Sequence, residues 1–145
     1  MTIREATTAD LGAVLALYAQ LHGEDVPAPS EALSELWAAI LADPNRHIVL
    51  VELERTVAGC CEVLVVPNLT HNQRPYALVE NVVTDEGFRR RGCAAAALNF
   101  AGEIARMNNC YKLMLMTGAR GPGNIELYET AGYNQQDKTA FVQWL

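Results

Sequence analysis

The sequence predicts a single α/β domain built on a mixed sheet. A chain of 145 residues, 50% of them hydrophobic, can bury one sizeable core. Some of its segments place apolar residues at helical spacing, whereas others are the β-branched runs typical of strands. Neither a repeat nor a low-complexity linker divides them. We therefore expect residues 1–145 to form one domain.

Two helices are expected early in the chain, after a short strand at residues 2–5. Thr7 and Asp10 are spaced as in a capping box, which indicates the start of the first helix, and Gly23 is expected to end it. Ser30 can cap the second helix, which should end at Asp43 before a proline. Each helix has one apolar face, formed by Leu11, Val14, Leu15, Tyr18 and Leu21 in the first and by Leu33, Leu36, Trp37, Ile40 and Leu41 in the second.

The pattern then changes to strands. Glu54 and Arg55 separate two β-branched runs and predict a hairpin, and a polar loop at residues 68–75 precedes a third long strand. Small and apolar residues from Ala94 to Ala105 recur at helical spacing and predict a crossover helix. The remaining expected elements are strands at residues 47–53, 56–66, 76–84 and 111–117, a short helix at 124–130, and a final strand or strands within 133–144.

Charge and composition exclude several classes of function. The net charge of −6 argues against a nucleic-acid-binding protein, because phosphate contacts need a basic face. Since the sequence has no apolar run long enough for a membrane helix and the N-terminus is charged, we expect a soluble, cytoplasmic protein without a membrane partner. The four cysteines form no C-x-x-C pair and have no histidine at ligand spacing, so we expect neither disulfides nor a metal site.

The most informative segment is VVTDEGFRRRGCA at residues 82–94, where a strand ends, a polar turn follows and small residues open a helix. The first N–H groups of a helix have no intrahelical partner and carry partial positive charge, which suits a diphosphate. Gly92 and Ala94 would let the backbone approach this ligand. Three arginines could neutralise two negative charges, although alone they would equally fit a solvated turn; they are Arg89, Arg90 and Arg91.

Two motifs carry a resemblance to a known family. RRRGCA at residues 89–94 resembles the R/Q-x-x-G-x-G/A signature with which GNAT acetyltransferases hold the diphosphate of coenzyme A. NIELYETAGY at residues 124–133 resembles their second signature, N-x-x-L/F-Y-x-x-x-G-F/Y. The order and spacing of the motifs and the two early helices also match, so the resemblance covers essentially the whole chain. It departs at Arg90, where the family usually has a small residue, and at Ala94, a permitted variant of glycine.

The resemblance implies a fold and a cosubstrate. The fold is a mixed, mostly antiparallel sheet of six or seven strands with helices on both faces, in which the fourth and fifth strands, residues 76–84 and 111–117, splay apart. The cosubstrate is acetyl-CoA, whose pantetheine arm would bond the unpaired backbone of the fourth strand as an added strand does. Asn124 would bond this arm or the adjacent backbone, or it simply caps its own helix. The expected cofactor contacts are Val82, Val83, Thr84, Arg89, Arg90, Arg91, Gly92, Cys93, Ala94 and Asn124.

The chemistry requires a base or a desolvating site to remove a proton, because an amine attacks only when neutral and free alkyl amines have pKa values of about 10. Glu80 is the candidate, since along an extended strand it shares a face with Val82 and Thr84. The alternative is that Glu80 faces solvent or pairs with an arginine.

The departing thiolate of coenzyme A needs a proton or a stabilising donor. The resemblance implies this role for Tyr128, which alternatively is a core aromatic residue. Cys93 lies at a helix N-terminus, where thiol pKa values fall, so a covalent acetyl-cysteine route is an alternative. Because Cys93 belongs to the diphosphate end of the site, we expect direct attack in a ternary complex instead.

The predicted acceptor is the primary amine of a small molecule. VENVV at residues 79–83 and CYK at 110–112 resemble the corresponding segments of glucosamine-6-phosphate N-acetyltransferases. An acidic surface would equally suit an aminoglycoside, a polyamine or a protein amino terminus. A protein or peptide acetyltransferase and a non-catalytic acyl-CoA-binding regulatory module therefore stay open as alternatives, as does a homodimer.

Overall fold

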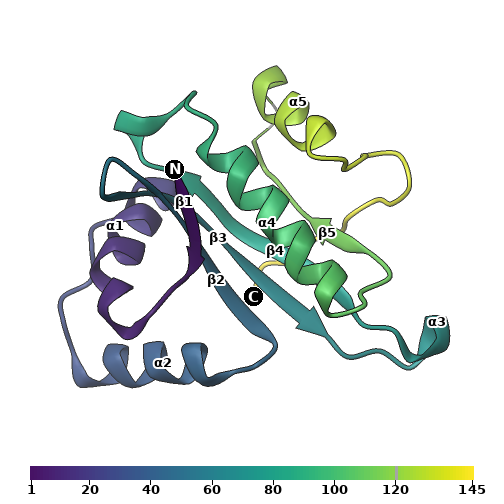
Figure 1. Ribbon diagram of the computed structural model, residues 1–145, viewed down its shortest axis with the longest axis horizontal. Helices are drawn as coiled ribbons and strands as arrows, with labels where there is room; N and C mark the ends of the chain where they lie inside the picture. Colours follow the sequence, from purple (N-terminus) through teal and green to yellow (C-terminus); the bar gives the residue numbers. More distant parts are fainter. Residues whose placement is uncertain (120) are drawn as a thin grey trace.

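The computed structural model describes residues 1–119 and 121–145. Its centre is a sheet whose strands follow one another in chain order (Figure 1). The first four strands pair antiparallel, whereas the fourth and fifth pair in parallel. The strands are β1 (Thr2–Glu5), β2 (Arg46–Leu53), β3 (Thr56–Val66), β4 (Tyr76–Thr84) and β5 (Leu113–Leu115).

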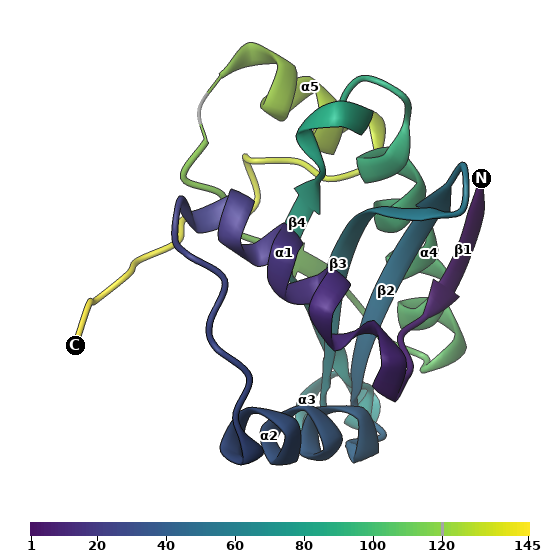
Figure 2. The same cartoon turned by 90° about the vertical axis from the view of Figure 1, so that its left-hand side faces the viewer.

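Helices cover both faces of the sheet, and each face has its own core. Helices α1 (Leu11–His22) and α2 (Glu31–Ala42) lie on one face, and α4 (Cys93–Met107) lies on the other (Figure 2). Helix α5 (Pro122–Thr130) adds Leu127 to the α4 core, and α3 (Thr70–Gln73) is a single turn before β4. In the described part of the chain, no helix has the length and apolar character needed to cross a membrane.

Local signals predicted the first two helices well. The N–H of Thr7 donates to Oδ2 of Asp10 at 2.7 Å, although α1 itself begins only at Leu11, after a 3-10 turn. Gly23 ends α1 in the left-handed conformation, with φ of 68°, and Ser30 caps α2 by accepting from the N–H of Leu33 at 3.2 Å.

The hairpin between β2 and β3 has the predicted two-residue turn. Glu54 and Arg55 both have positive φ, at 55° and 67°, which is the geometry of a turn whose twist matches that of the strands. The turn fixes the register in which Leu53 pairs with Thr56. It also holds Glu54 at the end of the sheet where β4 finishes.

The sheet is smaller than predicted. We expected six or seven strands, but the described residues form five, and the expected strand at 111–117 is only Leu113–Leu115. No strand forms within 133–144, where Phe141 and Trp144 are 92% and 91% exposed. The three-residue β5 gives this segment only a short edge to pair with, so its apolar residues do not suffice to make a strand.

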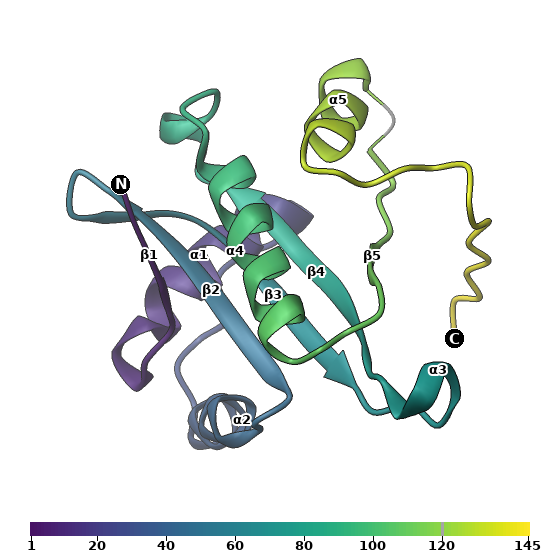
Figure 3. The same ribbon diagram turned by 45° about the vertical axis from the view of Figure 1, so that its right-hand side comes forward.

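The fourth and fifth strands separate early. Their ladder runs from Ala77 paired with Leu113 to Val79 paired with Leu115, whereas β4 continues to Thr84. Figure 3 shows β5 leaving β4 toward α5. The last five residues of β4 therefore have β3 on one side and no paired strand among the described residues on the other.

Candidate active site

A cavity of about 620 Å³ opens where β4 ends. Four segments line it: the end of α1, the last residues of β4, the turn into α4 with the first residues of that helix, and α5. The predicted site residues in its lining are Val82, Val83, Thr84, Arg89, Arg90, Gly92, Cys93, Ala94, Asn124 and Tyr128. Two predicted residues, Glu80 and Arg91, are not part of that lining. Among the predicted residues that line the cavity, Val82 and Tyr128 are the most distant in the sequence, and the fold brings them together although they are 46 residues apart.

The turn into α4 has the backbone of an anion cradle. Gly92 is the N-cap of α4 with φ of 84°, and Arg90 is also left-handed with φ of 59°. A Cβ at Gly92 would meet nothing within 4 Å, so the glycine is needed for its conformation and not for space. The first residues of α4, Cys93 to Ala95, line the cavity, and N–H groups at this end of a helix lack intrahelical partners.

The three arginines of the turn do not share one role. Arg89 lines the cavity and lies 3.4 Å from the carboxylate of Glu86. Arg90 also lines the cavity and forms no ion pair with any residue that the structure describes. Arg91 instead pairs with Glu54 of the β2–β3 turn, and its guanidinium stands 5.3 Å from the ring centre of Phe88. In this structure Arg91 ties the turn to the sheet, so our prediction that it faces the diphosphate finds no support in its geometry.

The end of β4 offers a polar group to the cavity. The hydroxyl of Thr84 is buried and has no hydrogen-bond partner among the described residues. Such a group costs free energy unless something bonds to it, so it fits a ligand that presents a polar atom here. Gly59 on β3 permits this arrangement, because a Cβ there would lie 2.9 Å from the carbonyl oxygen of Val83.

Two tyrosines follow on α5 and after it, in different environments. Tyr128 and Tyr133 pack edge to face with ring centres 6.4 Å apart. The hydroxyl of Tyr133 is buried, and burial raises the pKa of Tyr133. Tyr128 lines the cavity, which makes it the tyrosine of the pair that can reach a ligand.

Asn124 and Cys93 lie in different surroundings, one exposed and one buried. Gly121, not Asn124, is the N-cap of α5, and Asn124 lies exposed in the first turn of that helix, so capping does not explain it. Cys93 is 2% exposed, and burial raises the pKa of its thiol. A protonated, buried thiol is a poor nucleophile, which argues against the covalent route.

Glu80 does not share a face with Val82 and Thr84, and our prediction on this point is wrong. Glu80 pairs with Glu62 of β3, but Val83 pairs with Cys60, so β4 has one residue more than β3 between these pairs. This is a β-bulge, and it reverses the alternation of side chains beyond it.

The two cores confirm the reversal. Val82 packs with Val79 in the core beneath α4, whereas Val83 belongs to the core beneath α1 and α2. Glu80 therefore shares its face with Val83, on the α1 side of the sheet. The bulge includes Asn81, whose φ is 53°.

Sequence reasoning missed two polar residues, Gln20 at the cavity and Glu62 on the strand beside β4. Gln20 at the end of α1 lines the cavity, donates to Oδ2 of Asp85 at 2.8 Å and accepts from the N–H of Glu86 at 3.1 Å, which anchors α1 to the turn after β4. Glu62 on β3 is only 4% exposed. A glutamate within the apolar run GCCEVLVV was the available signal for Glu62; nothing in the sequence singled out Gln20.

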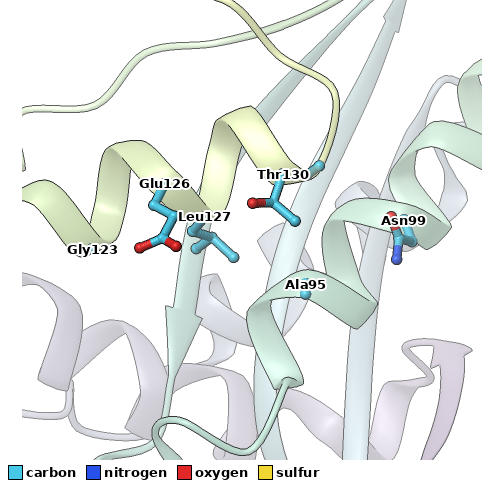
Figure 4. A pocket seen from close by; sticks show the side chains of 7 residues that line it. Ala95, Asn99, Gly123, Glu126, Leu127 and Thr130 are labelled. Atoms are coloured by element: carbon cyan, nitrogen blue, oxygen red, sulfur yellow. The ribbon is translucent and has the colours of Figure 1, made fainter.

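A smaller groove of about 300 Å³ continues the cavity between α4 and α5. Glu126, Leu127 and Thr130 project into it from α5, opposite Ala95 and Asn99 on α4 (Figure 4). Ala95 and Leu127 line both spaces, so the groove extends the cavity away from β4.

Comparisons with known proteins agree with this geometry. Residues 12–133 match the model of the family described as "Acetyltransferase (GNAT) family". A glucosamine 6-phosphate N-acetyltransferase from Trypanosoma brucei brucei is 25% identical over 130 residues, covering 86% of this chain and 85% of that protein.

Solved structures show the same architecture. A structure described as "Putative acetyltransferase from Agrobacterium tumefaciens str. C58" is 36% identical, with a TM-score of 0.92 and 100% of both chains covered. The glucosamine-6-phosphate N-acetyltransferase from Arabidopsis thaliana is 20% identical, with a TM-score of 0.85, covering 99% of this chain and 97% of that one.

Proposed function

This chain belongs to the acetyltransferase (GNAT) family and is an acetyl-CoA-dependent N-acetyltransferase, and we propose that it acetylates the primary amine of a small molecule by direct attack in a ternary complex. The observation that carries the proposal is the cavity of about 620 Å³ that joins the turn into α4 to Tyr128 and the end of β4. Bound acetyl-CoA supplies an acyl thioester, whose carbonyl carbon the amine attacks.

The diphosphate of the cosubstrate would lie on the turn into α4. The first N–H groups of the helix, the left-handed Gly92 and the side chains of Arg89 and Arg90 all meet at the cavity there. Ala94 and Ala95 keep this wall low, so the backbone can approach the ligand. Arg91 would act indirectly, by holding the turn through Glu54.

The pantetheine arm would extend along β4. Beyond Val79 this strand has no paired β5 residue in the described chain, so its backbone groups are available to an extended ligand. The buried hydroxyl of Thr84 would bond a polar atom of the arm. This path leads from the diphosphate turn toward Tyr128 and Asn124 on α5.

The acceptor amine would then approach from the α1 face of β4. Glu80 lies on that face, two residues before Val82, which is about 7 Å along a strand. From there its carboxylate would remove the proton of the ammonium group. Tyr128, which lines the cavity from α5, would donate to the departing sulfur.

An amino sugar phosphate is the first acceptor to test, because a relative acting on glucosamine 6-phosphate is similar over 86% of this chain. The net charge of −6 also favours cationic amines in general. The test is an assay of thiol release from acetyl-CoA with separate amines: glucosamine 6-phosphate, an aminoglycoside, spermidine and a peptide with a free amino terminus.

The outcomes separate the possible functions. We expect thiol release with a small amine and a product that is heavier than the amine by one acetyl group. Release only with the peptide would replace our proposal by protein acetylation. Tight binding of coenzyme A without release from any amine would indicate a regulatory binding module.

A further inference from the structure

Glu62 is an ionisable residue in the middle of a buried strand, and the proposed mechanism leaves it without a role. Its side chain is only 5% exposed. Burying a carboxylate is costly unless hydrogen bonds and an opposite charge satisfy it. Its partners therefore indicate why it is there.

Two side chains satisfy the Glu62 carboxylate. Nε of Arg46 on β2 donates to Oε1, and Nδ2 of Asn81 on β4 donates to Oε2 at 3.2 Å. The positive charge of Arg46 also offsets the negative charge of Glu62, which reduces the repulsion between Glu62 and the neighbouring Glu80. Glu62 lies directly opposite Glu80, and like charges in such a pair repel unless one of them is neutralised.

Asn81 is the unusual partner, because it is the residue at the bulge of β4. Its φ of 53° lies in the left-handed region, which costs every residue except glycine and costs asparagine less than most. A strand residue held in this conformation needs the surrounding structure to hold it. The hydrogen bond to buried Glu62 is the side-chain contact that does so.

The bulge decides what β4 presents to the cavity. It lies between Glu80, on the α1 face, and the cavity-lining residues Val82 to Thr84. Without the extra residue, the side chains beyond it would exchange faces, and Val83 instead of Val82 would pack beneath α4. The orientation of the backbone that would bind the pantetheine arm thus depends on Asn81.

We propose that Glu62 is a positioning residue for acetyl transfer: its carboxylate holds Asn81 in the left-handed conformation and so fixes the bulge that aims residues 82–84 at the cosubstrate. This inference rests on the proposed path of the cosubstrate along β4. Glu62 itself touches no substrate and acts only through Asn81.

The test measures binding of coenzyme A by calorimetry, without any acceptor. We expect Glu62→Gln to weaken binding about tenfold, because the neutral amide orients Asn81 less firmly. Asn81→Gly should weaken it less than threefold, since glycine adopts positive φ unaided. In the double variant the Glu62 substitution should add less than twofold, whereas residues acting independently would give multiplied effects.

Two further variants keep the test decisive. Should Glu62→Gln not fold, Asn81→Ala against Asn81→Gly answers the same question, because alanine disfavours positive φ and should lose about tenfold in affinity. Val65→Ala, in the α4 core of the same strand, is the control for general destabilisation and should lower the melting temperature while leaving affinity unchanged. Hydrogen exchange in residues 80–84 should rise in Glu62→Gln but not in Val65→Ala.

Wild-type affinity in Glu62→Gln, equal losses in the two Asn81 variants, or multiplied effects in the double variant would each overturn the role of Glu62. Failure of the proposed function is a separate result. The wild-type protein would then bind coenzyme A but acetylate no small amine, and the binding measurements on the variants would still stand.

Discussion

Gly92 is the residue at which the proposed cosubstrate site can be tested most directly. Replacing it by glutamate has two effects that the structure separates. The first is strain, because φ of 84° costs a residue with a side chain about 1–2 kcal/mol. There is no added clash, since a Cβ at this position meets nothing within 4 Å.

The second effect is charge repulsion at the cavity. Two unit charges about 4 Å apart interact by about 1 kcal/mol in water and about 4 kcal/mol near a protein surface. The diphosphate carries two charges, so the new carboxylate should oppose binding by at least about 2 kcal/mol, or roughly thirtyfold in Kd. We therefore expect Gly92→Glu to weaken binding of coenzyme A by at least that factor.

Calorimetry on three variants distinguishes these effects. Gly92→Ala carries the strain without the charge and should lose stability but far less affinity. Gly12→Glu adds the same charge on exposed α1, where a Cβ meets nothing within 4 Å and φ is not positive, and should bind as the wild type does. Added salt should shrink the Gly92→Glu penalty by screening. A Gly92→Glu protein that binds coenzyme A within threefold of wild type would refute the cradle.

Four other predictions concern chemistry and stability. Tyr128→Phe should lower kcat about tenfold or more with the Kd for coenzyme A unchanged; an unchanged kcat where chemistry limits the rate would remove Tyr128 from the mechanism. Double-reciprocal plots against acetyl-CoA should intersect as the amine varies, whereas parallel lines with an acetyl group on Cys93 would restore the covalent route. Glu80→Gln should slow turnover most at pH values where the amine is protonated, and a uniform loss would count against a base. Arg4 lowers the pKa of Asp10, so the ionised carboxylate stabilises the fold above its unfolded pKa of about 4, and this stabilisation is lost as the pH falls below that value. Asp10→Asn should therefore lower the free energy of unfolding in urea by about 2 kcal/mol at pH 7 and by less below pH 4.

Features set by local backbone preference were predictable from the sequence. A glycine that must be left-handed, a serine that accepts the free N–H of a helix, and a two-residue turn between β-branched runs each depend on neighbours a few residues away. Gly23, Ser30 and the pair Glu54–Arg55 all have the conformations that their types predicted. The helix start at Gly92 belongs to the same class.

Features set by distant partners were not predictable. Three consecutive arginines are equivalent in the sequence. In the structure Arg91 pairs with Glu54, which lies 37 residues away, and Arg91 does not line the cavity. The expected C-terminal strand failed for a similar reason. Apolar residues were present in this segment, but a strand also needs an edge of sufficient length to pair with, and β5 pairs with β4 over only three residues.

The face of Glu80 shows how one residue can change a mechanistic argument. The period-two rule is reliable only along an unbroken ladder, and the segment VENVVT contains no glycine or proline to warn of a bulge. With the bulge at Asn81, β4 directs Glu80 toward α1 and Val82 toward α4. In our proposal the free backbone edge of β4 therefore serves the cosubstrate, while the α1 face of the strand presents Glu80 to the acceptor. Because the edge and one face of a strand can be occupied at the same time, both substrates can be bound together, and this arrangement favours direct transfer over a shuttling acetyl-enzyme.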